Sequence, residues 1–298
     1  MIQPPYLQKG DTVALVCTAR KFSLEEAQPA VALLESWGLR VIYGATIGED
    51  NHQLGGTDAI RAADFNAMVA NPTVKAIWCA RGGYGSVRII DQIDFEQLKR
   101  TPKWVIGFSD VTVFHSQIHQ EGLQSLHGIM AFSVPKATEE SKESLLKSLF
   151  GETISYEIAS HSANRQGSAS GVLVGGNLSI LYSLLGSKSA LDTAGKILFI
   201  EDLDEYLYHL DRMMYNLKRN GYFEELKGLI VGGMTDMHDN SIPFGQNAIE
   251  IIKAISVEYG FPIVFDFPAG HGEANWALRF GAPVALEVKK STVTLKWI

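Results

Sequence analysis

The chain has 298 residues, of which 46% are apolar and 20% are charged, and its formal net charge at pH 7 is −7. These values are ordinary for a globular protein with one large or two medium domains, and the length allows a sizeable hydrophobic core. Binding to the phosphate backbone of nucleic acids requires a concentrated excess of Lys and Arg, and the sequence contains no basic run. We therefore exclude nucleic acid as a partner.

Two features of the sequence bear on the compartment. The two cysteines, Cys17 and Cys79, both lie within apolar, strand-like runs, which favours buried free thiols over a disulfide framework. The segment 1–11 has no continuous apolar stretch of signal-peptide length, and no uncharged span is long enough to cross a bilayer. We expect a cytoplasmic protein without a membrane partner.

The first part of the chain alternates short apolar runs with segments of helical periodicity. The apolar runs are too continuous for one-sided antiparallel strands, so the alternation predicts βαβ units and a parallel sheet. The expected strands are 12–17, 39–43, 74–80, 104–108 and 123–127, and the expected helices are 23–37, 57–70 and 110–120.

The pattern weakens between residues 133 and 166, around Pro135, a charged helix-like piece and a polar stretch. We expect an N-terminal α/β domain at 1–135, a linker at 136–166 and a C-terminal β/α domain at 167–298. The second part continues the alternation and ends in two runs that suit a hairpin, so the predicted fold class is α/β. Its expected strands are 169–174, 196–200, 228–231, 262–265, 283–288 and 292–297, and its expected helices begin near Asn177, Tyr206 and Gln246.

Ser109 lies where an apolar strand pattern breaks at Gly107 and an amphipathic helix pattern begins after Asp110. A hydroxyl on such a turn lies beside helix N-terminal amides, which are donors for the oxyanion that forms when a serine attacks a carbonyl. The same Ser-Asp pair is also typical of a helix N-cap, and the second glycine of the Gly-x-Ser-x-Gly elbow is missing. The pattern predicts a serine hydrolase that is not an α/β-hydrolase by motif.

A serine nucleophile needs a base and an orienting acid. Among the eight histidines, His271 has the most permissive setting, because glycine on both sides lets the backbone approach a reacting centre. A loop histidine that caps a turn is the alternative. Glu201 ends an apolar run, and the carboxyl ends of strands in open α/β sheets gather catalytic groups. Asp202, Asp204 and Glu205 follow closely, so the pattern alone does not say which carboxylate acts.

Three other motifs have simpler interpretations. His115 and His119 have zinc-ligand spacing, but a serine stands where a zinc peptidase carries its glutamate, so we interpret both as helix-face residues. Cys79 lies within a strand rather than on a turn, which favours a core role. The glycine turns at 82–85 and 175–177 match no dinucleotide or P-loop fingerprint and are interpreted as tight turns with closely approaching amides. We predict no metal or cofactor site.

Five motifs, spread in order over nearly the whole chain, resemble those of the L,D-carboxypeptidase family. They are Ala80-Arg-Gly-Gly-Tyr-Gly85, Gly107-Phe-Ser-Asp-Val-Thr112, Gly175-Gly-Asn-Leu-Ser179, Phe199-Ile-Glu-Asp-Leu-Asp-Glu205 and Gly270-His-Gly272. The resemblance implies an N-terminal parallel-sheet domain that resembles class I glutamine amidotransferases, joined to a C-terminal swivelling β/α domain.

The resemblance also implies the activity. Ser109 corresponds to the catalytic serine, Glu201 to the glutamate and His271 to the histidine of a Ser-His-Glu triad. The implied reaction is hydrolysis of the L,D bond that releases terminal D-alanine from cytoplasmic murein tetrapeptides, a step of peptidoglycan recycling. Close relatives instead inactivate the antibiotic microcin C. The implied partner is a small muropeptide substrate, the implied assembly is a homodimer, and no cofactor is implied.

Further roles follow from a triad mechanism. The backbone amides of Asp110 and of Gly82 or Gly83 are expected to bind the tetrahedral oxyanion. Arg81 is expected to bind a free carboxylate of the substrate, because a guanidinium clamps a planar anion with two hydrogen bonds; a structural salt bridge is the alternative. A non-enzymatic two-domain protein that binds small molecules is the alternative to the enzyme.

Overall fold

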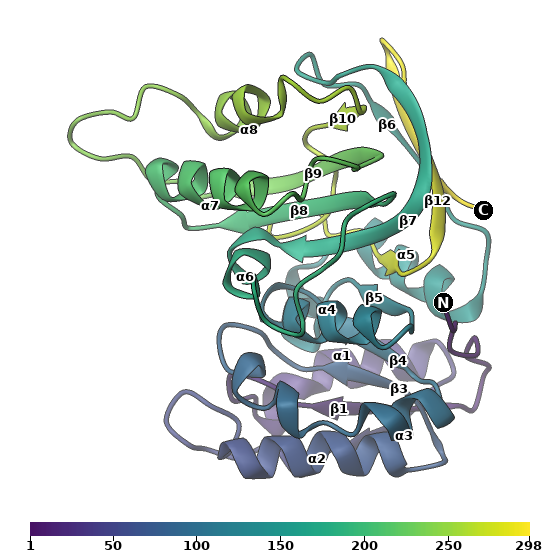
Figure 1. The fold of residues 1–298 in the computed structure, drawn as a ribbon. Helices are drawn as coiled ribbons and strands as arrows, with labels where there is room; N and C mark the ends of the chain where they lie inside the picture. Colours follow the sequence, from purple (N-terminus) through teal and green to yellow (C-terminus); the bar gives the residue numbers. More distant parts are fainter. The chain divides into compact units, whose positions relative to one another are not determined.

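The computed structural model describes residues 1–298, which form two compact units. The first unit consists of Met1–Thr153 and Asn275–Gly281, and the second consists of Ile154–Ala274 and Ala282–Ile298. Each unit has its own sheet, flanked by helices (Figure 1). The predicted α/β class with two sheet-based parts is therefore confirmed. None of the helices has the length and apolar character needed to cross a lipid bilayer.

The first unit is built on a six-stranded sheet with the order β11-β5-β4-β3-β1-β2. All neighbouring strands run parallel except β11, which is antiparallel to β5. The strands are β1 (Thr12–Val16), β2 (Arg40–Tyr43), β3 (Val74–Cys79), β4 (Trp104–Gly107), β5 (Ser125–His127) and β11 (Leu278–Phe280). The α-helices are α1 (Leu24–Ser36), α2 (Asp58–Ala70), α3 (Phe95–Arg100), α4 (Thr112–Gln120) and α5 (Glu139–Phe150).

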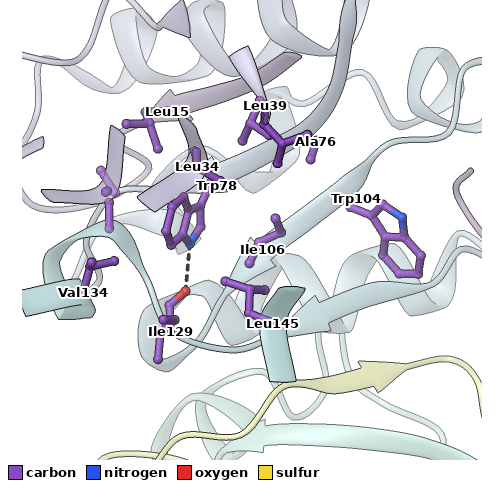
Figure 2. Close-up of a cluster of buried hydrophobic side chains, with 14 of the residues drawn as sticks. Leu15, Leu34, Leu39, Ala76, Trp78, Trp104, Ile106, Ile129, Val134 and Leu145 are labelled. Atoms are coloured by element: carbon purple, nitrogen blue, oxygen red, sulfur yellow. Dashed lines mark hydrogen bonds between the residues drawn. The ribbon is translucent and has the colours of Figure 1, made fainter. Parts of the chain in front are cut away.

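One face of this sheet packs into a large hydrophobic cluster (Figure 2). Side chains on a strand alternate between faces, so Leu15 of β1 and Ile106 of β4 reach this cluster together with Leu34 of α1. Trp78 of β3 is fully buried, and its indole Nε1 donates a 2.7 Å hydrogen bond to the Ile129 carbonyl. A buried donor without an acceptor would cost about 1–3 kcal/mol, so this bond makes the burial of Trp78 tolerable. The cluster fixes the strands whose carboxyl ends carry the candidate residues of this unit.

The second unit has a seven-stranded sheet with the order β10-β9-β8-β7-β12-β13-β6. Figure 1 shows β7 as a long, curved strand that takes part in both halves of this sheet. Its first half pairs antiparallel with β12, and its second half pairs parallel with β8. The strands are β6 (Ser155–Ala159), β7 (Gly167–Asn177), β8 (Ile197–Leu203), β9 (Gly228–Thr235), β10 (Ile263–Val264), β12 (Pro283–Val288) and β13 (Thr292–Trp297).

Three helices pack against one face of the parallel part of this second sheet. They are α6 (Leu178–Ser183), α7 (Leu207–Arg219) and α8 (Ala248–Ser256). Leu198 of β8 and Val231 of β9 join Met213 of α7 and Ile252 of α8 in one buried cluster. This packing holds β8, the strand that carries the predicted glutamate.

The observed division of the chain differs from the expected one in two places. The stretch 136–166 contains α5, which belongs to the first unit, and β6, which pairs with β13 in the second. The segment Asn275–Gly281, expected in the C-terminal domain, belongs to the first unit, because β11 pairs with β5. A side-chain hydroxyl of α5 also holds this segment in the first unit, since Ser141 Oγ accepts a 2.9 Å hydrogen bond from the Asn275 amide.

Candidate active site

Ser109 lies on a tight turn directly after β4. The chain passes from Phe108 into the 3-10 turn Ser109–Val111 and then into α4. Ser109 has a φ of 60°, a left-handed conformation that is uncommon for residues other than glycine and that concentrates at functional sites. Neither the 3-10 turn nor α4 has a side-chain hydrogen bond at its N-cap, so the N-cap interpretation of Ser109 is wrong.

The glycine turn after β3 runs alongside this serine. A Cβ atom added at Gly82 would lie 3.3 Å from the Cβ and 3.5 Å from the Oγ of Ser109. Gly83 has a φ of 102°, and a Cβ there would lie 2.6 Å from the Nε of Arg20. The prediction of a tight turn whose backbone approaches its neighbours is confirmed for this glycine segment.

Arg81 precedes these glycines and is partly buried, with 28% of its side chain exposed. Its guanidinium carbon lies 4.1 Å from the centre of the Phe132 ring, a cation–π contact. Its Nη1 lies 3.8 Å from Glu26 Oε1, while Oε2 of the same carboxylate accepts a hydrogen bond from the Ser23 amide. A long, partly exposed ion pair of this kind contributes little stability, so the salt-bridge alternative has only a weak contact behind it.

In the second unit, Glu201 and His271 form a close hydrogen-bonded pair. The Nδ1 of His271 lies 2.6 Å from Glu201 Oε2; Glu201 is fully buried, and 14% of the His271 side chain is exposed. Burial by itself lowers the pKa of His271, but the charge and hydrogen bond of Glu201, together with the charge of Asp202, outweigh burial and raise it. An Nδ1–H that donates to the carboxylate makes Nε2 the basic nitrogen, the tautomer that a general base requires.

Glycines allow the loop that carries His271 to approach Glu201. Gly270 has a φ of 107°, and a Cβ at this position would lie 2.7 Å from both Cβ and Oε2 of Glu201. On the neighbouring strand, a Cβ at Gly232 would lie 2.3 Å from the carbonyl oxygen of Ala269. The Gly233 amide donates a 3.1 Å hydrogen bond to that same oxygen. The loop is therefore fixed at van der Waals distance from the strand end, as the flanking glycines predict.

The four acidic residues that follow Ile200 have separate partners. Glu201 is the one that hydrogen-bonds His271. Burial, together with the charge of Glu201, raises the pKa of Asp202 to about 7. The other pairings are Asp202 with Asn177 and with the amides of Ser179 and Leu203, Asp204 with His238, and Glu205 with His209. Of these four carboxylates, Glu201 is therefore the one paired with His271.

His115, Cys17 and Cys79, which the sequence also singles out, are all buried in the first unit. Both ring nitrogens of His115 are engaged, Nδ1 with Ser125 Oγ and Nε2 with the carbonyl of Gly107, each at 2.8 Å. Burial lowers the pKa of His115 to about 4, so the ring is neutral at pH 7. Cys17 and Cys79 are buried free cysteines, as predicted, and burial raises the pKa of each thiol to about 12.

One buried carboxylate next to Ser109 has no counterpart in the sequence prediction. Asp110, for which only a backbone role is predicted, is 2% exposed, and its Oδ2 accepts a 2.8 Å hydrogen bond from the Ser86 amide. An aspartate directly after the serine is the signal for it, but the partner lies 24 residues earlier. The candidate residues therefore form two groups: Ser109, Asp110, Arg81 and the glycine turn in the first unit, and Glu201 with His271 in the second.

Comparison with known proteins assigns the chain to a class. The profile of the LD-carboxypeptidase N-terminal domain matches residues 13–128, and that of the LD-carboxypeptidase C-terminal domain matches residues 170–286. The chain belongs to the LD-carboxypeptidase family, a class of serine-type hydrolases that cleave peptide bonds. This membership supports the enzyme over the non-enzymatic binding protein.

Individual relatives span nearly the whole chain. This chain is 35% identical to a probable murein peptide carboxypeptidase of Bacillus subtilis, over 99% of this chain and 94% of the relative. It is 29% identical to the murein tetrapeptide carboxypeptidase of Pseudomonas aeruginosa, over 96% and 94%. The fold resembles the crystal structure of muramoyltetrapeptide carboxypeptidase from Oxalobacter formigenes, with a TM-score of 0.89, 24% identity and coverage of 96% and 98%. It also resembles the microcin C7 self immunity protein, with a TM-score of 0.86, 22% identity and coverage of 98% and 97%.

Proposed function

We propose that this enzyme releases terminal D-alanine from murein tetrapeptides by hydrolysing the bond between the L-centre of a diamino acid and the D-alanine. The observation that carries the proposal is the 2.6 Å pairing of His271 Nδ1 with the buried carboxylate of Glu201. This pairing favours the Nδ1–H tautomer, in which Nε2 is free to act as a general base. The full-length similarity to two murein peptide carboxypeptidases supports the substrate class.

The proposed reaction is acyl transfer through a covalent intermediate. Ser109 Oγ attacks the scissile carbonyl while His271 takes its proton, and Glu201 stabilises the imidazolium that forms. The amides of Asp110 and of Gly82 or Gly83 bind the tetrahedral oxyanion. When the intermediate collapses, His271 returns the proton to the leaving amino group and D-alanine departs. Water, deprotonated by the same imidazole, then attacks the acyl-enzyme. The ester bond to Ser109 Oγ breaks, His271 returns the proton to that oxygen, and the shortened peptide departs.

We assign recognition of the terminal carboxylate of D-alanine to Arg81. Its guanidinium is held over Phe132 and has only a long contact with Glu26, so it remains able to form a bidentate pair with a substrate carboxylate. Carboxylate recognition would explain why cleavage is confined to the end of the peptide.

The experiment that tests the function uses Ser109→Ala. Purified protein is incubated with a free murein tetrapeptide, and products are followed by mass spectrometry. Wild-type protein is expected to yield tripeptide and D-alanine, and the variant to lose at least about 10³-fold in kcat with an unchanged fold by circular dichroism. Turnover by Ser109→Ala equal to that of the wild type would refute the nucleophile.

The microcin-type substrate is the competing assignment within the same family. The same assay, run with a processed peptidyl-adenylate antibiotic in place of the tetrapeptide, compares kcat/KM for the two substrates. A higher value for the tetrapeptide is expected, and a higher value for the antibiotic would transfer the assignment to antibiotic inactivation.

Two further parts of the proposal concern the cell and the assembly. We place the enzyme in the cytoplasm, where recycled murein peptides are processed, and we propose that it acts as a homodimer, as the family resemblance implies. Light scattering on purified protein is expected to give twice the chain mass of 32.7 kDa. A monomer mass at assay concentrations would remove the dimer from the proposal.

A further inference from the structure

The side chain of Asp110 lies next to the nucleophile in sequence but is buried away from solvent. Only 2% of the residue is exposed, and its Oδ2 accepts a 2.8 Å hydrogen bond from the Ser86 amide. The Ser86 hydroxyl and the Gly85 amide interact with the same carboxylate. Burying a carboxylate is unfavourable unless hydrogen bonds replace its hydration, and here the replacements come from the end of the glycine turn that follows β3.

The segment Gly82–Ser86 is otherwise weakly constrained by its own sequence. It contains three glycines, and two of them, Gly83 and Gly85, have φ values of 102° and 141°. Glycine has the largest backbone freedom of all residues, so contacts outside the segment must determine its conformation. At its amino end, the Gly82 carbonyl accepts a 3.4 Å hydrogen bond from the Arg20 amide. At its carboxyl end, buried charged side chains contact Gly85 and Ser86.

A buried arginine provides the second attachment. Arg61 is 1% exposed, and its Nη1 donates to the carbonyl of Gly85 at 2.9 Å and to the carbonyl of Thr18. The Ser86 hydroxyl lies 3.2 Å from the Thr18 hydroxyl, which closes the network. Arg61 thereby joins the end of the glycine segment to the loop that follows β1, and Asp110 joins it to the turn that carries Ser109.

The consequence for the site follows from the close approach at Gly82. The Cβ position of Gly82 is 3.3 Å from Ser109, so a small displacement of the segment changes the position of its amides relative to the serine. An oxyanion hole works only when its donors are fixed before charge develops. We propose that the Asp110 carboxylate is a positioning residue that holds the Gly82–Ser86 segment against the Ser109 turn and so pre-organises the oxyanion-binding amides. This inference rests on the proposed function.

The test compares Asp110→Ala with the conservative Asp110→Asn and with Asp64→Ala. Asp64 is a matched control, because it is a buried carboxylate of the same unit that accepts hydrogen bonds from the amides of Ala45 and Thr46. Asp110→Ala is expected to lower kcat for D-alanine release about 100-fold while KM changes less than about threefold. Asp110→Asn keeps an oxygen that can accept from Ser86 and is expected to recover most of that loss. Asp64→Ala lowers the melting temperature but leaves the kcat of the folded protein within about threefold.

Hydrogen–deuterium exchange gives a readout that does not depend on the substrate. In Asp110→Ala, the amides of residues 82–86 are expected to exchange at least about tenfold faster than in the wild type, and in Asp64→Ala they are not. Unchanged exchange would overturn the positioning role, and so would faster exchange with wild-type kcat. If the wild type itself released no D-alanine, the proposed function would fail, while the exchange data would still decide whether Asp110 holds the segment.

Discussion

The two groups of candidate residues are held in place by different forces. We call Phe108–Asp110, together with the adjoining segment Gly82–Ser86, the nucleophile turn. Its shape is determined by backbone conformation, with a left-handed serine and glycines at positive φ. The histidine pair, Glu201 with His271, is instead held together by the attraction between the His271 ring and the buried Glu201 carboxylate, whose Oε2 lies 2.6 Å from Nδ1. In the proposed mechanism, the nucleophile turn provides the geometry of the site and the histidine pair provides the proton affinity.

This difference predicts two kinds of mutational effect. Changes in the nucleophile turn move hydrogen-bond donors and lower kcat without altering which group titrates. Changes around the histidine pair alter the pKa of the base and therefore move the pH profile as well as the rate. A substitution in one region that gives the effect assigned to the other region would contradict this division.

The largest effect is expected for Glu201→Gln. The amide cannot stabilise the imidazolium, and it can donate to Nδ1 and so favour the wrong tautomer, which predicts a loss of about 10³- to 10⁴-fold in kcat, measured by D-alanine release. Glu205→Gln is the matched control, because Glu205 Oε2 also lies 2.6 Å from a histidine Nδ1, that of His209. The control is expected to stay within about threefold of the wild type. Equal losses of kcat in both variants would mean that Glu201 has no special role as the partner of the base.

An intermediate effect is expected for Gly270→Ala, which alters the geometry of the histidine pair and leaves its charges in place. The new Cβ would lie 2.7 Å from Glu201 on a backbone with φ of 107°, a strain worth about 1–3 kcal/mol of unfolding free energy. Displacement of the His271 loop is expected to lower kcat about 100-fold. Thermal denaturation and D-alanine release measure the two effects.

Gly272→Ala, on the other side of the histidine, serves as the control for Gly270→Ala. The nearest heavy atom to its added Cβ is 3.9 Å away, so a change within about 0.5 kcal/mol and near-normal turnover are expected. A Gly272→Ala variant as impaired as Gly270→Ala would show that loop flexibility, rather than the close approach to Glu201, explains the loss.

The same contrast explains what the sequence could predict. Local patterns are enough for the strand that ends before Ser109, for the run that ends at Glu201 and for the glycines beside His271, because each signal lies within a few residues. β11 was not predicted, since Leu278–Phe280 gains its strand character from pairing with Ser125–His127, about 150 residues earlier. No local periodicity records such a pairing.

Side-chain partners follow the same rule. Sequence reasoning assigns Asp110 a backbone amide and nothing more, because its carboxylate is satisfied by Ser86, with which it shares no spacing motif. The choice of Glu201 among four neighbouring acids likewise rests on the resemblance, and strand position alone leaves it open. The sequence also does not predict the helix α3, since six residues are too few to establish a helical period. The strand β6 lies at the edge of its sheet and pairs only with β13, which is more than 130 residues later in the chain.

The smallest effect is expected for Asp202→Asn, which removes a charge beside the histidine pair. The charge of Asp202 contributes to the raised pKa of His271, so its removal should lower that pKa. Because the base must be neutral, the acid limb of the wild-type kcat/KM profile is expected at a pH above 6.5, the ordinary imidazole value. The acid limb of Asp202→Asn is expected at a lower pH than that of the wild type, and its plateau rate is expected to change less than about threefold.

The matched pH control is Asp110→Asn, a carboxylate-to-amide change in the nucleophile turn, which is expected to leave the acid limb in place. The sign can be checked independently by unfolding. A raised histidine pKa stabilises the fold fully below the unfolded value of about 6.5 and loses that contribution as pH rises through the folded pKa. The wild type should therefore lose more stability than Asp202→Asn between pH 5 and pH 8. Asp202 itself, with its pKa of about 7, adds to this loss, because burial disfavours the charged form that it takes on as the pH rises. An acid limb that moved with Asp110→Asn and not with Asp202→Asn would reverse the assignment of geometry to one region and charge to the other.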